Sequence, residues 1–299
     1  MQDARWMLVT YHDDDPGKPQ VGIAANGVVY RAPELLAGRS MLEILADWET
    51  LAPVLRTVTT SGGEPVPGAR LLAPILFPAK VLCAGANYYG HLTEMGIGRP
   101  EPPGEPYFFL KPPTTTVIGP SAEVLLPARP GRQIDWEGEL GVVIGKRCHD
   151  VPAGRARDVV AGWTVLDDVS ARDRLERTDV VSEHFGFDWF AAKGEDTFCP
   201  MGPGVVPDWL VDNPQRLGIR LSVNGVVKQD STTADMITGI WELIAAASRS
   251  VTLEPGDVIA TGSPAGVGLP RGEFLAPGDE VVVQVEQVGT LRHRVADGR

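Results

Sequence analysis

The 299-residue sequence contains little cysteine and no long apolar run. Its three cysteines, Cys83, Cys148 and Cys199, are widely spaced and form no CxxC pair. This argues against a disulfide framework and against a thiolate zinc site. No apolar run is long enough to span a bilayer, and the N-terminal segment is acidic where a signal peptide would be basic. We therefore expect neither a membrane protein nor a secreted one, and we expect a cytoplasmic location.

Basic runs and nucleotide-binding motifs are missing as well. The chain has 27 basic and 39 acidic residues, a net charge of -12, and no stretch rich in lysine and arginine, which argues against nucleic-acid binding. The Gly-rich stretches GANYYG and ATGSPAGVG do not form a GxGxxG fingerprint, so a dinucleotide site is not expected. GxSxG and HExxH motifs are also absent. A surplus of carboxylates is compatible with an enzyme that binds a cation.

The first part of the chain predicts a small α+β domain. The alternating runs WMLVTY and VGIAANGVVYRA carry Asn26-Gly27, which is typical of a hairpin turn. Apolar residues at helical spacing predict a helix from Ser40 to about Thr57. Residues 59–78 are rich in glycine and proline, which disfavour regular elements. We therefore predict a domain boundary near residue 75, with domains over residues 1–75 and 76–299.

The remainder of the chain consists mainly of short β-type runs separated by Gly, Pro and Asp turns. These runs are KVLCAGA, YFFLK, ELGVVIG, GWTVLDDV, IRLSVNG, DVIATG, EVVVQVEQVG and LRHRVA. The main helix candidates lie around His91 to Met95 and from Thr233 to Ser250. Many strands and few helices predict a mixed, mainly β fold.

The string IDWEGELGVVIG predicts a metal site. Side chains two apart in a strand share a face, so Glu137 and Glu139 project together, while Gly138 is expected to leave the other face unobstructed. Hard divalent cations such as Mg²⁺ prefer carboxylate oxygens. A third ligand comes from Asp167-Asp168 at the end of an apolar strand, where we favour Asp168. Taken alone, an ExE pair is usually a solvated strand face and Asp-Asp an ordinary turn.

Three further features are candidates for catalysis. His91 and Glu94 are three residues apart, which places them on one helix surface as a possible general base for water, followed by a Gly- and Pro-rich segment that suggests a lid. Lys193 follows an aromatic run and is a candidate for a cation held inside a cleft. Thr261 begins a Gly-rich turn whose N–H groups suit a carboxylate. Each has a plain alternative, namely a surface pair, a surface lysine and a simple turn.

Read together, these strings resemble the fumarylacetoacetate hydrolase family from about Lys80 to Val285. The matching strings are GANYYGHLTEMG, FFLKPPTT, DWEGELGVVIG, DDVSARD, AAKGEDTFCPMGP, VNGVVKQDSTTADMI and LEPGDVIATGSPAGVG. The resemblance implies a β-sandwich roll as the catalytic domain, usually in a homodimer, preceded by the small α+β domain. It also implies Mg²⁺ or Mn²⁺ bound by an ExE pair and a later Asp, which fall on Glu137, Glu139 and Asp168.

The same resemblance implies roles for residues around the metal. The water-activating pair of hydrolytic members falls on His91 and Glu94, and the family lysine on Lys193. Expected substrate-binding residues within the matching strings are Tyr88, Lys111, Thr261 and Gly262. One departure is Leu175, where related members often carry a glutamine that binds substrate.

The resulting hypothesis is a Mg²⁺- or Mn²⁺-dependent hydrolase that cleaves a C–C bond in a 2,4-dioxo acid, either acylpyruvate-like or fumarylacetoacetate-like. Water deprotonated by His91 would attack the distal carbonyl, and Lys193 would stabilise the departing enolate. The closest alternatives are an oxaloacetate-type decarboxylase and a 2-oxo-dienoate isomerase or hydratase. More distant ones are a non-catalytic scaffold and a nicotinamide-dependent reductase. The expected partners are a small oxo acid and a second copy of the chain.

Overall fold

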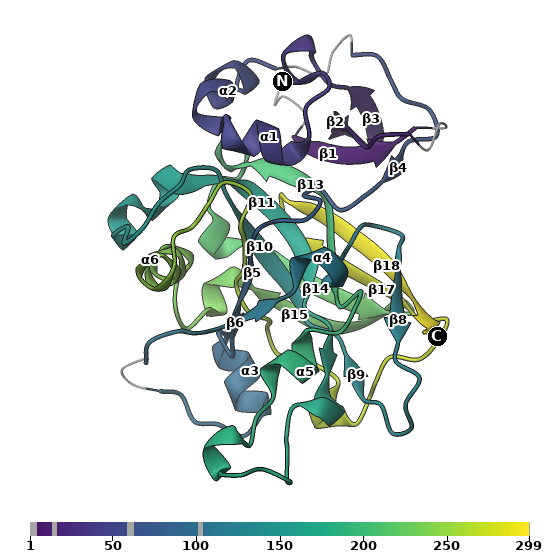
Figure 1. Cartoon of the computed structure of the whole chain (residues 1–299), viewed down its shortest axis with the longest axis vertical. Helices are drawn as coiled ribbons and strands as arrows, with labels where there is room; N and C mark the ends of the chain where they lie inside the picture. Colours follow the sequence, from purple (N-terminus) through teal and green to yellow (C-terminus); the bar gives the residue numbers. More distant parts are fainter. Residues whose placement is uncertain (1–4, 14–16, 59–62, 101–103, 299) are drawn as a thin grey trace.

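The computed structural model describes residues 5–13, 17–58, 63–100 and 104–298, and all structural statements refer to these ranges. Two large β-sheets pack face to face, with short helices at their margins (Figure 1). Within these ranges, none of the helices is both long and apolar enough to cross a membrane. The mixed, mainly β fold predicted from the sequence is confirmed.

The first sheet has 11 strands and runs from the N-terminal segment to the middle of the molecule. Its order is β3 (Val28–Arg31), β2 (Gln20–Ala25), β1 (Trp6–His12), β13 (Cys199–Pro207), β11 (Val160–Asp167), β10 (Gly138–Ile144), β16 (Val258–Ala260), β5 (Val81–Gly85) and β6 (Tyr107–Lys111), with β4 (Arg70–Leu71) on β1 and β7 (Val117–Ile118) on β13. Every residue of β10 and β11 is buried, because both faces of these strands are covered.

The second sheet packs against β10, β11 and β13. Its order is β15 (Val226–Thr232), β14 (Gly218–Val223), β17 (Glu280–Val285), β18 (Gly289–Asp297) and β8 (Glu123–Leu126), and a separate pair joins β9 (Ile134–Asp135) to β12 (Ser170–Ala171). In β14 and β17 alternate side chains are buried, as expected for strands with one covered face. Leu221 and Val283 of this sheet share the main core with Leu140 and Val165 of the first.

The helices are short, and α1 and α5 begin at side-chain caps formed by Ser40 and Asp188. The α-helices are α1 (Met41–Ala46), α2 (Trp48–Leu55), α3 (Tyr89–Glu94), α4 (Pro113–Thr116), α5 (Trp189–Lys193) and α6 (Ile240–Ser250), and the 3₁₀ helices are η1 (Glu34–Leu36), η2 (Ala153–Val159), η3 (Arg172–Arg174), η4 (Glu183–Phe185), η5 (Asp208–Leu210), η6 (Pro214–Arg216), η7 (Thr233–Asp235) and η8 (Leu269–Arg271). The single helix predicted from Ser40 is wrong in one respect, because it breaks at Asp47, whose carboxylate pairs with Arg39. The helix predicted from Thr233 begins only at Ile240, after the N-cap Gly239.

The N-terminal segment joins the first sheet directly. The predicted hairpin is confirmed, since Asn26-Gly27 connects β2 to β3. β1 pairs with β13 through Leu8 and Val205, and one apolar cluster takes side chains from both sides of residue 75. The boundary near residue 75 stays a prediction, and residues 59–62 of the predicted boundary segment lie outside the described residues. β13 was not predicted, because its prolines and glycines are unusual in a central strand.

Candidate active site

Three buried carboxylates converge where two central strands meet. β10 and β11 are antiparallel, with Gly138 opposite Asp167, so Glu137 just before β10 and Glu139 within it lie beside Asp168 just after the end of β11. Each offers an oxygen within 4.8 Å of the others, and their exposed fractions are 7%, 1% and 2%. The structure thus brings together the three ligands predicted from the sequence.

Gly138 corrects one detail of the sequence argument. The face opposite the carboxylates was expected to be unobstructed, but a Cβ at this position would lie 2.8 Å from a methyl group of Val283. Its N–H donates to Gln229, and Leu221 also approaches. The glycine therefore allows the second sheet to pack directly beneath the carboxylates, where it holds β10 in place.

Three cationic side chains surround the carboxylates. Lys193 Nζ lies 2.8 Å from Glu137 Oε1 and 2.7 Å from Asp168 Oδ2, and Lys111 Nζ lies 2.7 Å from Asp168 Oδ1. Arg172 Nη2 lies 2.7 Å from Glu137 Oε1. Lys193 is 3% exposed, so the predicted placement of its ammonium inside a cleft is correct.

Arg172 is a site residue that the sequence analysis did not single out. Besides contacting Glu137, its Nε donates to Asp135 Oδ2 over 2.9 Å. Burial would lower the pKa of Arg172, but the carboxylates of Glu137 and Asp135 raise it above its ordinary value. The only signal in the sequence was its position in the SARD string directly after the ligand strand.

The two glutamates of the ExE pair differ in their electrostatics. Burial would raise the pKa of Glu137, but Lys193 and Arg172 lower it below its ordinary value. Burial together with the charges of Asp168 and Glu137 raises the pKa of Glu139 well above its ordinary value. Among the described residues no lysine or arginine pairs directly with Glu139, and the nearby charge of Lys193 only partly offsets its burial, so a divalent cation would supply the missing positive charge. The donor set, three carboxylates and no sulfur, suits Mg²⁺ or Mn²⁺.

The N–H groups of the Gly-rich turn after β16 were predicted to suit a carboxylate. In the structure they donate to carboxylates of the protein itself. The Gly262 N–H donates to Glu139 Oε2 over 2.7 Å, and the Gly266 N–H donates to Glu94 Oε2 over 2.8 Å. Both glycines have positive φ angles, 97° and 111°, which side chains rarely adopt. The Thr261 hydroxyl donates to a main-chain carbonyl of β10. This turn therefore positions two acidic residues of the site.

The predicted histidine–carboxylate pair is formed on α3. His91 Nδ1 lies 2.6 Å from Glu94 Oε1, and both side chains are largely buried. Since the other oxygen of Glu94 accepts the Gly266 N–H, the carboxylate holds the imidazole from a fixed position. The contact leaves Nε2 as the ring nitrogen that does not face Glu94.

A cavity of about 710 Å³ connects these groups. Its polar lining comprises His91, Glu94, Glu137, Asp168, Arg172, Lys193 and Glu176. Four predicted substrate-binding residues, Tyr88, Lys111, Thr261 and Gly262, are absent from the lining within the described part of the chain. Lys111 donates to the carbonyls of Val169, Lys193 and Phe198 besides pairing with Asp168. Direct substrate contact by these four residues stays a prediction.

A buried pair behind the site also escaped the sequence analysis. His293 on β18 lies with its Nε2 2.7 Å from Asp167 Oδ2, and neither side chain is exposed. The other oxygen of Asp167 accepts the Glu137 N–H over 2.7 Å. His293 therefore braces the backbone of the candidate ligand Glu137 from the second sheet.

Solved structures share this architecture, and curated relatives are similar in sequence. A fumarylacetoacetate hydrolase from Exiguobacterium antarcticum is 31% identical, with a TM-score of 0.82 and coverage of 99% of this chain and 100% of that one. A maleylpyruvate hydrolase from Sphingobium sp. SYK-6, solved with manganese(II) and pyruvate, is 29% identical, with a TM-score of 0.77 and coverage of 98% and 100%. A human mitochondrial oxaloacetate tautomerase is 40% identical over 261 residues, which are 86% of this chain and 80% of that one.

The family prediction is confirmed by the same comparisons. Residues 80–296 match the family model described as fumarylacetoacetate (FAA) hydrolase C-terminal. Proteins similar to this chain carry the names of hydrolases and of a tautomerase, which are enzymes. This chain belongs to the fumarylacetoacetate hydrolase family.

Proposed function

We propose that this protein is a Mg²⁺- or Mn²⁺-dependent hydrolase that cleaves a C–C bond in a 2,4-dioxo acid of the acylpyruvate or fumarylacetoacetate type. The observation that carries the proposal is that one cavity combines the His91–Glu94 pair with Lys193 and two of the three clustered carboxylates. A base, a buried cation and a metal-binding group are the components that hydrolysis of a β-dicarbonyl requires.

Glu137, Glu139 and Asp168 would hold the metal ion, which supplies Lewis-acid polarisation of substrate oxygens. Charge balance supports this assignment. With Asp135 included, four carboxylates lie beside three cations, Lys111, Lys193 and Arg172, so the group has one excess negative charge when all are ionised. A divalent cation would leave one excess positive charge, which an anionic oxo acid neutralises.

The chain's own residues would carry out the proton transfers. With Glu94 accepting from Nδ1, the Nε2 of His91 would take a proton from water as the oxygen attacks the distal carbonyl carbon. The bond between that carbon and the neighbouring methylene then breaks, and its electron pair becomes an enolate facing Lys193. Protonation of the enolate gives a 2-oxo acid such as pyruvate, and the attacked carbon leaves as a carboxylic acid.

A tautomerase is the second candidate, because the human relative is named an oxaloacetate tautomerase. A base near a polarised oxo acid suffices to move a proton between carbon and oxygen without attack by water. The cavity volume favours the hydrolase, since about 710 Å³ lies within the range of pockets that enclose drug-sized ligands and exceeds the needs of a four-carbon acid. Decarboxylation stays open as a variant of the same site.

Product analysis tests the proposal. The protein would be incubated with acylpyruvates of increasing size and with oxaloacetate, with and without Mg²⁺, and pyruvate, the second acid, CO₂ and enol absorbance would be measured. We expect pyruvate and acid in equal amounts, lost on addition of EDTA. CO₂ or tautomerised substrate without a second acid would reject the hydrolase in favour of an alternative.

The predicted homodimer is a separate proposal, which light scattering on the purified protein tests.

A further inference from the structure

The cavity over the candidate metal site has two chemically different parts. Its floor carries the charged groups already described, including Glu137, Asp168 and Lys193. The rest of its lining is mainly apolar and includes Met95, Ile97, Phe109, Leu175, Phe187 and Trp189. Ligand cavities commonly combine an apolar wall with a few oriented polar groups. In this one, the apolar wall is extensive enough to interact with a substantial substrate group.

Part of the apolar wall belongs to a small antiparallel flap between η3 and α5. Glu176 and Phe187 form a β-bridge, and the Asp188 N–H donates to the carbonyl of Leu175 over 2.8 Å. These contacts hold Leu175 and Phe187 on neighbouring positions of the cavity lining. Phe187 is 61% exposed and has apolar surface available to contact a ligand.

A second part of the wall is an aromatic stack beside the lysine. The rings of Phe109 and Trp189 stack with their centroids 5.3 Å apart. Lys193 Nζ lies 5.1 Å from the centre of the Phe109 ring. The stack therefore borders the charged floor, and a chain that leaves the floor passes directly onto apolar surface. Met95 and Ile97, which follow α3 in the chain, also line the cavity and are 39% and 51% exposed.

The cations of the cavity are already committed to protein carboxylates. Arg172 pairs with Asp135 and Glu137, and Lys193 pairs with Glu137 and Asp168. Among the described lining residues, no other lysine or arginine is present. The remaining ionisable groups are His91, held by Glu94, and two acids, Glu94 and Glu176. A carboxylate at the far end of a substrate would therefore meet apolar and acidic groups without a cation to compensate its desolvation.

We propose that this cavity selects 2,4-dioxo acids with one carboxylate and an apolar acyl group, and discriminates against substrates with a second carboxylate at the distal end. The inference rests on the proposed function, because it assumes that the oxo-acid end occupies the charged floor. Apolar contact favours the first class, and the absence of a free cation beside Glu176 disfavours the second. Leu175 is the lining residue that we assign as a determinant of this choice.

Matched substrates test the selection. Straight-chain acylpyruvates would be compared with 2,4-dioxo acids of the same length that end in a carboxylate, at saturating Mg²⁺. We expect kcat/KM to rise about fourfold for each added methylene that reaches the wall, and to be at least about tenfold higher for the alkyl member of each pair. Equal values, or a preference for the dicarboxylate, would overturn the inference.

Substitution at Leu175 locates the determinant. Leu175→Arg introduces a cation into the apolar wall and is expected to narrow or reverse the preference, while Leu175→Met retains it. Val54→Arg is the control, since Val54 is 47% exposed on α2 and does not line the cavity. If Leu175→Arg and Val54→Arg keep the same substrate ratio while both melt like the parent protein, the assignment of Leu175 is wrong.

Binding of uncleavable acids separates this inference from the proposed reaction. 2-Oxooctanoate and 2-oxooctanedioate have the same length and lack the 4-oxo group, so neither can undergo hydrolysis. Calorimetric titration with Mg²⁺ present should show tighter binding of the monoacid. If it does so while no acylpyruvate is cleaved, the hydrolase fails and the selection stands. If acylpyruvates are cleaved but the two acids bind equally, the hydrolase stands and the selection fails.

Discussion

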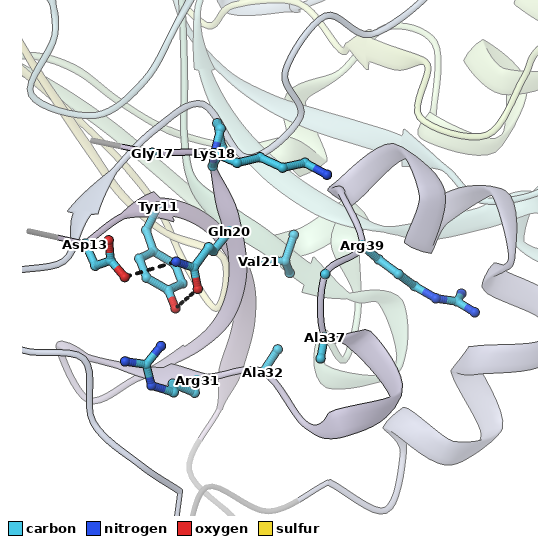
Figure 2. A pocket seen from close by; sticks show the side chains of 12 residues that line it. Tyr11, Asp13, Gly17, Lys18, Gln20, Val21, Arg31, Ala32, Ala37 and Arg39 are labelled. Atoms are coloured by element: carbon cyan, nitrogen blue, oxygen red, sulfur yellow. Dashed lines mark hydrogen bonds between the residues drawn. The ribbon is translucent and has the colours of Figure 1, made fainter. Parts of the chain in front are cut away.

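Two cavities of this protein differ in how deeply their charged side chains are buried. The cavity of the N-terminal segment, about 470 Å³, is lined by Tyr11, Gln20, Arg31 and Arg39 among others (Figure 2). Arg31 pairs with Glu64 and Arg39 with Asp47, and all four of these side chains are more than a third exposed. In the site cavity, by contrast, Lys193 and Asp168 are only 3% exposed.

The comparison shows that burial and convergence, more than the presence of charged residues, mark the active site. Exposed ion pairs are screened by water and require no compensation from elsewhere in the protein. Burying Glu137, Glu139 and Asp168 together costs folding free energy unless cations or a bound metal offset it.

Glu139→Ala is expected to reduce metal-dependent turnover to background. Glu139 has no cation paired to it among the described residues, so its carboxylate is the one most dependent on a bound metal. Turnover of an acylpyruvate and Mn²⁺ binding by paramagnetic resonance measure the effect. Normal turnover that still requires metal would refute the proposed site.

His91→Ala should lower kcat by roughly 10²- to 10⁴-fold, the usual contribution of a general base. Mn²⁺ affinity should stay as in the parent, because His91 contacts Glu94 and not the carboxylate cluster. Glu94→Gln is the matched variant, expected to act in the same direction with a smaller effect. If His91→Ala lowered Mn²⁺ affinity by as large a factor as it lowers kcat, the imidazole would instead belong among the metal ligands.

His293→Ala should weaken Mn²⁺ binding by about 10- to 100-fold, as outer-sphere substitutions commonly do. The change leaves Asp167 buried without its partner, and Asp167 fixes the backbone of Glu137. Loss of a buried partner also costs on the order of 3 kcal/mol of unfolding free energy. Mn²⁺ titration of the folded protein, with a urea melt beside it, separates the two effects. Unchanged Mn²⁺ affinity would make His293 purely structural.

The metal-free protein should lose stability as the pH rises above the ordinary pKa of a glutamate. Folding raises the pKa of Glu139, so between its unfolded and folded values the folded state holds a proton that the unfolded state has released. Stability from this group is complete below that interval and is lost across it. Mn²⁺ should remove the dependence by replacing the proton. Thermal melts over a pH series, with and without Mn²⁺, measure this pH dependence. Identical pH profiles with and without Mn²⁺ would contradict the prediction.

Arg39→Ala provides the smallest expected effect. The side chain of its partner Asp47 is 38% exposed, and the N-terminal cavity shares no lining residue with the site cavity among the described residues. Turnover and Mn²⁺ affinity should match those of the parent protein. A loss of turnover comparable to that of His91→Ala would show that the N-terminal cavity takes part in catalysis. The contrast between the two cavities would then not hold.

Local sequence patterns predicted much of the site, because their geometry repeats within a single element. The ExE spacing placed two carboxylates together at the start of β10, and the HxxE spacing placed His91 beside Glu94 on α3. The Asn26-Gly27 turn was predictable for the same reason. By contrast, the Gly- and Pro-rich β13 could not be recognised, because its place in the sheet depends on pairing with β11 and β1.

The sequence predicted the family and the mainly β fold, both of which are confirmed, and it singled out the candidate metal ligands and the candidate base. Tertiary structure alone decided which charges offset one another: Arg172 on Glu137, the Gly266 N–H on Glu94, and His293 on Asp167, a pair 126 positions apart. It also decided that Lys111 turns toward protein oxygens. The physical reason is that strand and helix periods govern neighbours in sequence, whereas sheet packing brings distant groups into contact and sets their desolvation.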